Sequence, residues 1–238
     1  MGRQGEGQPR RPDGNWLQPL LELVFPTRCL GCGCHGSVWC ARCNAALEPL
    51  CGPLCAVCGD PLSGRSVCRR CSHSDLSFPI RSFAHYRGPL ARALVRLKYR
   101  PSTEMAAVMG EWLGQVVRQA GWRIELAVPV PLGRARQRRR GYNQGALIAS
   151  SLAGSLGIDF RPAAIQRTRE TPSQVGLDAE ARRRNVQGAF QARPQDVQDR
   201  SVCLVDDLMT TGATLVACAE AVRLAGGGTV VGVTVGRA

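Results

Sequence analysis

The segment from Val202 to Leu215, VCLVDDLMTTGATL, limits the possible folds of this chain more than any other stretch. Its apolar start is typical of a buried strand, and apolar residues at helical spacing resume after two acids and a run of small residues. We therefore predict a strand over 201–205, a helix over 214–225 that ends at three glycines, and a last strand over 229–235. Strands that alternate with helices in this way build parallel sheets.

The loop between the predicted strand and helix carries groups that suit a phosphate and a sugar. In open α/β sheets ligands bind at the carboxyl ends of strands, and a helix amino terminus offers free backbone N–H groups to a phosphate. Gly212 permits a positive φ or a close backbone approach, and two adjacent acids can accept hydrogen bonds from vicinal hydroxyls. The alternative is an ordinary strand, turn and helix in which Asp and Thr act as helix caps. The residues predicted to bind a phosphoribosyl group are Asp206, Asp207, Thr210, Thr211, Gly212, Ala213 and Thr214.

Further elements precede this segment. The apolar run over 126–130 is bounded by prolines and predicts a buried strand. The polar, arginine-rich stretch over 161–200 is weakly periodic, so we expect an excursion with one helix near 178–184. Helical spacing predicts helices over 90–98 and 104–119, and the stretch over 144–156, rich in Ala, Leu and Ser, predicts a third. The sequence therefore predicts an α/β domain over 79–238, with a parallel sheet flanked by helices.

Ten of the twelve cysteines lie between Cys29 and Cys71, mostly in C-x-x-C pairs. In a chain without a secretory signal, such pairs indicate metal more often than disulfides, which remain the alternative. Four thiolates satisfy tetrahedral Zn²⁺ with no open position, so each unit predicts a structural site. The predicted ligands are Cys29, Cys32, Cys40 and Cys43 in the first unit and Cys55, Cys58, Cys68 and Cys71 in the second. The pairs can also interleave between sites, and Cys34, His35 and Cys51 are left over, with His35 taken as a non-ligand.

The residues before this module are expected to be a disordered leader over 1–14 and a short helix that begins the module region, 15–78. The apolar run over 16–25 is too short to span a bilayer. We therefore expect no membrane insertion and a cytoplasmic location.

Positive charge is concentrated in the larger part of the chain. Residues 1–80 carry 8 basic and 6 acidic residues, whereas residues 81–238 carry 23 and 12, a net charge of +11. This balance favours a polyanionic ligand, either a phosphorylated small molecule or a nucleic acid, over the alternative of a charge that serves solubility. Lys98 is the single lysine beside thirty arginines, which suggests a specific role for its compact ammonium at a phosphate, although chance is an equal alternative.

The segment from Val202 to Leu215 resembles the motif with which type I phosphoribosyltransferases bind phosphoribosyl pyrophosphate (PRPP). Together with the cysteine module, the chain is similar to the ComF/GntX family of bacterial phosphoribosyltransferase-like proteins from about residue 20 onward. The other segments that carry this resemblance are Val128–Leu132, Arg139–Gln144, Gln166–Arg169, Thr171–Leu177 and Asn185–Phe190.

The resemblance implies a type I phosphoribosyltransferase fold with a small amino-terminal zinc-ribbon module, PRPP bound with Mg²⁺, and a link to DNA uptake in natural transformation. It places a mobile loop that closes over PRPP at 166–190. It assigns contacts to the pyrophosphate or to this loop to Lys98, Leu132, Gly133, Arg134 and Arg140.

Two functions remain open at this point. One is a phosphoribosyltransferase whose acceptor and general base the sequence does not name. The other is a non-catalytic PRPP sensor that binds single-stranded DNA or a helicase-like partner through its zinc ribbon and arginines. We also expect PRPP binding to survive loss of the module, because the loop over 210–214 that would hold the 5′-phosphate, the phosphate loop, is predicted to lie on a separate core.

Overall fold

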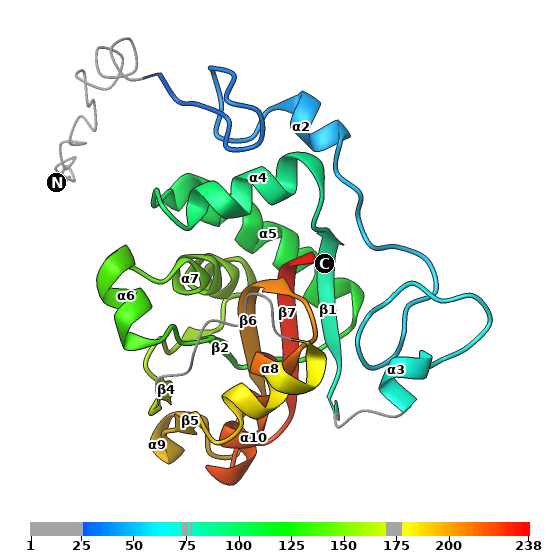
Figure 1. Cartoon of the computed structure of the whole chain (residues 1–238), viewed down its shortest axis with the longest axis vertical. Helices are drawn as coiled ribbons and strands as arrows, with labels where there is room; N and C mark the ends of the chain where they lie inside the picture. Colours follow the sequence, from blue (N-terminus) through cyan, green and yellow to red (C-terminus); the bar gives the residue numbers. More distant parts are fainter. Residues whose placement is uncertain (1–25, 73–75, 77, 170–177) are drawn as a thin grey trace, which may run out of the picture.

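A parallel sheet forms the centre of the computed structural model, which describes residues 26–72, 76, 78–169 and 178–238. Its strands lie in the order β1-β7-β6-β2-β3, and every pairing is parallel (Figure 1). The strands are β1 (Ile80–His85), β2 (Leu126–Pro129), β3 (Asp159–Phe160), β6 (Val202–Met209) and β7 (Val230–Arg237). The predicted α/β class is confirmed, while the predicted leader and the helix before Pro26 lie outside the described residues.

The strand order places a crevice between β2 and β6. From β2 the chain runs through α7 (Gln144–Leu156) to β3 on one side, and from β6 it runs through α10 (Ala213–Leu224) to β7 on the other. The two connections therefore diverge between neighbouring strands. Such a switch point is where open α/β sheets bind their ligands, at the carboxyl ends of the strands.

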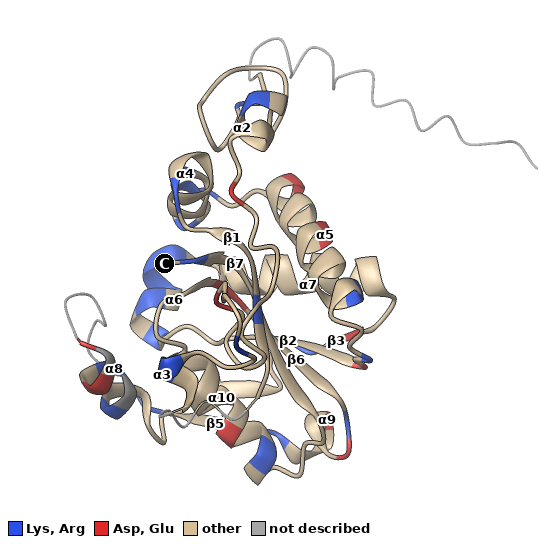
Figure 2. Cartoon of the chain, turned by 90° about the vertical axis from the view of Figure 1, so that its right-hand side faces the viewer, with Lys and Arg blue, Asp and Glu red and all other residues tan. Residues whose placement is uncertain are grey.

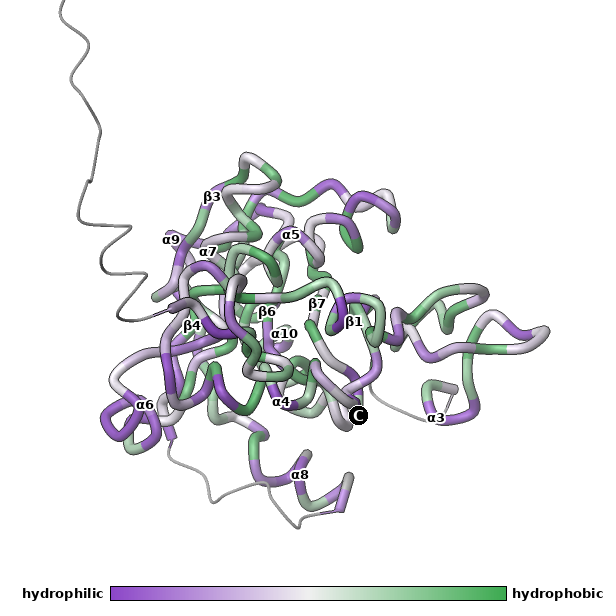
Figure 3. The backbone as a smooth tube through the Cα atoms, turned by 90° about the horizontal axis from the view of Figure 1, so that it is seen from above, coloured by the Kyte–Doolittle hydropathy of each residue, from purple (hydrophilic) through white to green (hydrophobic). Residues whose placement is uncertain are grey.

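Helices and a small hairpin cover the two faces of the sheet. The helices α4 (Gly88–Leu97), α5 (Thr103–Gln119) and α7 form one hydrophobic cluster with β6 and β7. On the other face α10 packs with α8 (Ala179–Val186) and an antiparallel pair, β4 (Ile165–Arg167) and β5 (Phe190–Ala192). The remaining helices are α2 (Ala41–Ala45), α3 (Arg69–Ser72), α6 (Arg134–Arg140) and α9 (Pro194–Val197). Figure 3 shows that α6 and α8 are predominantly hydrophilic.

The predicted helices over 90–98, 104–119, 144–156 and 214–225 are confirmed to within two residues. The strand predicted over 201–205 continues to Met209, because β7 pairs with it as far as Arg237, so both acids of the motif lie within a strand. The excursion over 161–200 contains the predicted helix, as α8, and also the two short strands of the hairpin.

The cysteine module covers the open edge of the sheet at β1. The amide of Leu50 donates to the carbonyl of Phe83 at 2.9 Å, and the amide of His85 donates to the carbonyl of Glu48 at 2.9 Å. These bonds satisfy backbone groups that an edge strand would otherwise expose. On the adjacent face, Trp39 of the first unit meets the ring of Trp112 on α5 edge-on, with centroids 5.4 Å apart.

The second cysteine unit belongs to the same core as the phosphate loop. Cys55, Cys58 and Cys71 are buried in one hydrophobic cluster with Met209 and Leu215. The prediction that the loop lies on a separate core is therefore wrong. Periodicity along the sequence reports which face of an element is apolar, but it does not report which distant element covers that face.

Candidate functional site

A pocket of about 420 Å³ opens at the switch point. The residues after β2, the end of β6 and the start of α10 form its floor, and side chains from α6, β4 and α8 form its walls. All of the residues predicted to bind the phosphoribosyl group line this pocket: Asp206, Asp207, Thr210, Thr211, Gly212, Ala213 and Thr214. Lys98, Leu132 and Arg140 line the same pocket, whereas Gly133 and Arg134 do not, and Arg134 lines a neighbouring hollow beside Gln166.

The loop that joins β6 to α10 has the geometry of an anion site. Gly212 is the N-cap of α10 with φ of +83°, as its predicted conformational role requires. The Ala213 amide donates to Oγ1 of Thr211 at 3.4 Å, which fixes this hydroxyl beside the helix start. The first amides of a helix have no partner within the helix, and the dipole favours negative charge there. This end of α10 can therefore hold a phosphate.

The two acids of the motif differ in environment. Asp207 is buried and held from two sides, because Nζ of Lys98 lies 3.0 Å from Oδ2 and Nε2 of Gln144 donates to the same oxygen at 3.1 Å. Asp206 accepts a hydrogen bond from the Asp207 amide at 2.8 Å. Burial, followed by the neighbouring Asp207 charge, raises the pKa of Asp206 well above its ordinary value. Lys98 thus compensates the charge of Asp207, whereas the environment of Asp206 disfavours its ionised form.

The raised pKa of Asp206 predicts a pH-dependent stability difference. The folded protein holds this proton more tightly than the unfolded chain, so stability falls as the pH rises above about 4, the pKa of an unperturbed Asp. We expect Asp206→Asn to melt a few degrees higher than the wild type near neutral pH, because the amide keeps an oxygen acceptor for Asp207 and carries no charge.

Thermal melting of both proteins across the pH range checks this. The gain in melting temperature should shrink as the pH falls to about 4 and below, where the side chain at position 206 is uncharged in both proteins. A variant that is less stable than the wild type at neutral pH would contradict the assigned environment of Asp206.

Arginines form the walls of the pocket. Arg136, Arg139 and Arg140 come from α6, and Arg167 and Arg182 come from β4 and α8. Figure 2 shows the basic segments of α6 and α8 on the same side of the molecule. Burial lowers the pKa of Arg140, but an arginine remains charged at any physiological pH. The pocket therefore favours a ligand with several negative charges.

The segment after α6 ties the pocket walls to the sheet. Gly141 ends α6 with φ of +81°, and the Tyr142 hydroxyl donates to the carbonyl of Leu97 at the end of α4. The Asn143 side chain caps α7 by accepting from the Gly145 amide at 2.9 Å, and it donates to the Val130 carbonyl at 3.0 Å. These bonds explain why residues 141–144 differ in character from the arginines before them: they orient α6, α7 and the end of β2 towards one another.

The second group of thiols suits a structural zinc. The sulfurs of Cys55, Cys58, Cys68 and Cys71 all lie within 4.8 Å of one another, and Sγ of Cys58 is 3.7 Å from Sγ of Cys68. Tetrahedral ligands at the usual Zn–S distance are about 3.8 Å apart. The Cys68 amide lies 3.4 Å from Sγ of Cys55, and such a donor favours a thiolate. The predicted ligand set and the arrangement of the side chains agree here.

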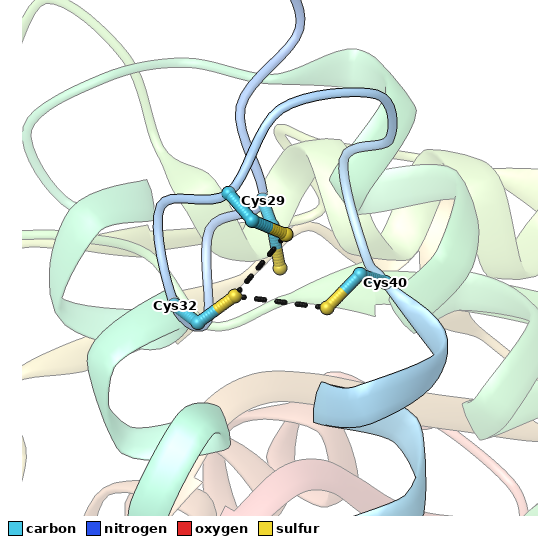
Figure 4. A group of neighbouring side chains, drawn as sticks. Cys29, Cys32 and Cys40 are labelled. Atoms are coloured by element: carbon cyan, nitrogen blue, oxygen red, sulfur yellow. Dashed lines mark hydrogen bonds between the residues drawn. The ribbon is translucent and has the colours of Figure 1, made fainter.

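The first group differs from the prediction by one residue. The sulfurs of Cys29, Cys32, Cys34 and Cys40 lie within 4.8 Å of one another, and Figure 4 shows the labelled Cys29, Cys32 and Cys40 side chains converging. Cys34 joins because Gly33, with φ of +84°, turns the chain back, and the Cys29 amide donates to the Cys34 carbonyl at 2.8 Å. Cys43, the predicted fourth ligand, lies outside that group of four but keeps its sulfur 3.6 Å from Sγ of Cys29. Five thiols are thus available for one tetrahedral site.

The comparisons with known proteins agree with these features. Residues 20–72 match the model of the double zinc ribbon domain. The DNA utilization protein YhgH of Salmonella typhimurium is 34% identical over 184 residues, which cover 74% of this chain and 81% of that protein. The chain belongs to the ComF family.

One further relative and one solved structure are also similar to this ComF family member. Competence protein F of Haemophilus influenzae is 31% identical over 206 residues, with 80% of this chain and 88% of that protein covered. Among solved structures, the glutamine PRPP amidotransferase from B. subtilis is 19% identical over 55% of this chain and 26% of its own, with a TM-score of 0.39. Across the part of the chain that the structure describes, no helix has the length and apolar character that crossing a membrane requires.

Proposed function

We propose that this ComF family protein binds PRPP together with Mg²⁺ in the pocket between β2 and β6 and transfers its phosphoribosyl group to an acceptor. One observation carries the proposal: the acid pair and the phosphate loop meet in one pocket at the switch point, opposite a wall of arginines. A phosphate, a diol and a pyrophosphate would each find suitable partners there.

Different residues of the chain would bind the phosphate, the ribose and the pyrophosphate of PRPP. Backbone amides and hydroxyls from Thr210 to Thr214 would hold the 5′-phosphate, and Asp206 and Asp207 would accept hydrogen bonds from the ribose hydroxyls. Lys98 and the α6 arginines would neutralise the pyrophosphate as the leaving group gains charge. Bound Mg²⁺ would supply further charge neutralisation on the pyrophosphate oxygens. Positioning and electrostatics would provide most of the rate enhancement, and no general base is assigned.

A second candidate function is a PRPP sensor that does not catalyse transfer and instead binds single-stranded DNA or a helicase-like partner. The arginines on α6 and α8 favour it, since they extend positive charge beyond the pocket floor. Relatives named for DNA utilization and competence are consistent with it. Pyrophosphate release across candidate acceptors, with and without single-stranded DNA, separates the two functions. If arginines contact DNA phosphates, binding should weaken steeply with salt.

Calorimetric titration with PRPP and Mg²⁺ tests the shared premise. We expect the wild type to bind, and the double variant Asp206→Asn/Asp207→Asn to bind about 10- to 100-fold more weakly, because the ribose hydroxyls would lose the charged acceptor that Asp207 offers, and a hydrogen bond to a charged group contributes about 1.5–3 kcal/mol. Glu104→Gln removes an exposed carboxylate at the start of α5 and should bind like the wild type. A wild type that does not bind, or a double variant that binds equally well, would refute the proposal.

A further inference from the structure

Arg237 connects the second group of thiols to the phosphate loop. It is the last residue of β7, and it is only 4% exposed. One guanidinium nitrogen, Nη1, donates to the Cys58 carbonyl at 2.8 Å and lies 3.2 Å from the sulfur of Met209. The other, Nη2, lies 3.7 Å from Sγ of Cys58, and Nε pairs with the carboxylate of Asp60. One buried side chain therefore touches both sites.

Met209 contacts both Arg237 and the phosphate loop. It ends β6, directly before Thr210, and its carbonyl accepts from the Ala238 amide at 3.0 Å. Its methyl group packs against Gly212, the N-cap of α10, and a Cβ placed there would lie 2.9 Å from Cε of Met209. A continuous path of packed groups thus leads from Cys58 through Arg237 and Met209 to the residue that begins the anion-binding helix.

The buried charge of Arg237 depends on the zinc site. A buried cation is costly unless anions and hydrogen-bond acceptors compensate it. Asp60 supplies one anion, and four thiolates around a bound Zn²⁺ would supply a further net negative charge beside Nη2. A bound metal would also fix the turn that carries Cys58 and Asp60, since metal binding and folding are coupled in such small units. Without the metal, Arg237 would lose the geometry of its partners.

We propose that Arg237 is a positioning residue through which the second zinc site holds the phosphate loop in its ligand-binding conformation. Zinc occupancy at Cys55, Cys58, Cys68 and Cys71 and the affinity for PRPP are then coupled. Coupling between two sites is reciprocal, so bound PRPP raises the affinity for zinc by the same factor. The part that concerns PRPP rests on the proposed function, whereas the ordering of the loop does not.

The variant Arg237→Lys tests this in the full chain, with Arg70→Lys as its matched control. Lysine keeps a positive charge for Asp60, but its single ammonium cannot also reach Cys58 and Met209. Arg70 contacts the same Asp60 carboxylate at 3.0 Å from a half-exposed position on α3. If only the charge near the metal mattered, both variants would behave alike.

Three readouts are compared: zinc content, amide hydrogen exchange over residues 209–214, and PRPP affinity. Arg237→Lys should retain its zinc, exchange its loop amides faster, and bind PRPP about tenfold more weakly, while Arg70→Lys matches the wild type. Removing zinc from the wild type with a chelator should accelerate the exchange of the same amides, and PRPP should raise the chelator concentration needed to remove the zinc. If Arg237→Lys does not fold, Met209→Leu keeps the packing, loses the contact to Arg237, and should show the same faster exchange.

Unchanged loop exchange and unchanged PRPP affinity in a zinc-loaded Arg237→Lys protein would overturn the proposal. Loop exchange that does not respond to zinc removal would overturn it as well. A wild type that does not bind PRPP would refute the proposed function alone, because the exchange measurement without PRPP still decides whether the zinc site orders the loop.

Discussion

The variant Cys58→Ser is expected to lose one of about two zinc ions per chain and to melt about 6–20 °C lower than the wild type. Cys58 is buried in the core that contains the phosphate loop, and both its carbonyl and its sulfur face Arg237. Breaking a buried ionic network typically costs about 3–5 kcal/mol, and each kcal/mol shifts the melting temperature of a chain of this size by about 2–4 °C. Elemental analysis and thermal melting measure the two effects.

Cys51→Ser is the control for this change. Cys51 is exposed and belongs to neither group of clustered thiols. It should keep the zinc content and the melting temperature of the wild type. A chain purified under reducing conditions without zinc, or a Cys58→Ser protein as stable as the wild type, would contradict the structural role of this metal site.

Gly212→Ala is expected to abolish measurable PRPP binding while lowering stability only modestly. Gly212 has φ of +83°, where a Cβ costs about 1–2 kcal/mol. The added methyl would also meet Cε of Met209 at 2.9 Å, so that side chain must move, and the methyl itself would stand where a phosphate would approach the backbone most closely. Calorimetry with PRPP and a denaturant melt together separate the loss of affinity from the loss of stability.

Gly157→Ala provides the matched control. Gly157 ends α7 with φ of +66°, and a Cβ there would meet nothing within 4 Å. It carries the same kind of backbone strain in open space, far from the pocket. We expect a similar loss of stability and normal PRPP binding. If both variants bind PRPP equally well, Gly212 does not shape the binding site.

Local patterns in the sequence predict the central elements of the fold well. The run of four apolar residues from Val202, the acids and the small-residue loop predict the start of β6 and the helix α10 from local sequence alone, whereas the extension of β6 to Met209 follows from its pairing with β7. The edge strand β1 escaped prediction, because its sequence mixes Arg and Ser with apolar residues and its pairing partner lies some 150 residues further along the chain. The arginines of α6 have no apolar stripe, so nothing in their periodicity indicates a helix.

The parts of the site that depend on distant contacts could not be predicted. Arg237 stands near the end of the sequence among ordinary strand residues, and only the fold brings it to Cys58. Lys98 stood out by composition, yet its pairing with Asp207 follows from how α4 ends beside β6. The approach of Cys34 to the first thiol group depends on the positive φ of Gly33, and the C-x-x-C spacing gives no sign of that turn.

Amide hydrogen exchange with and without PRPP and Mg²⁺ tests the central claim most directly, because it locates the ligand on the chain. We expect PRPP to protect the amides of residues 210–215 at the start of α10, where a phosphate would accept their hydrogen bonds. Ribose 5-phosphate, which lacks the pyrophosphate, should protect the same amides at higher concentration. Protection confined to the arginines of α6 and α8, with residues 210–215 unchanged, would show that the loop does not hold the phosphoribosyl group and would contradict the account.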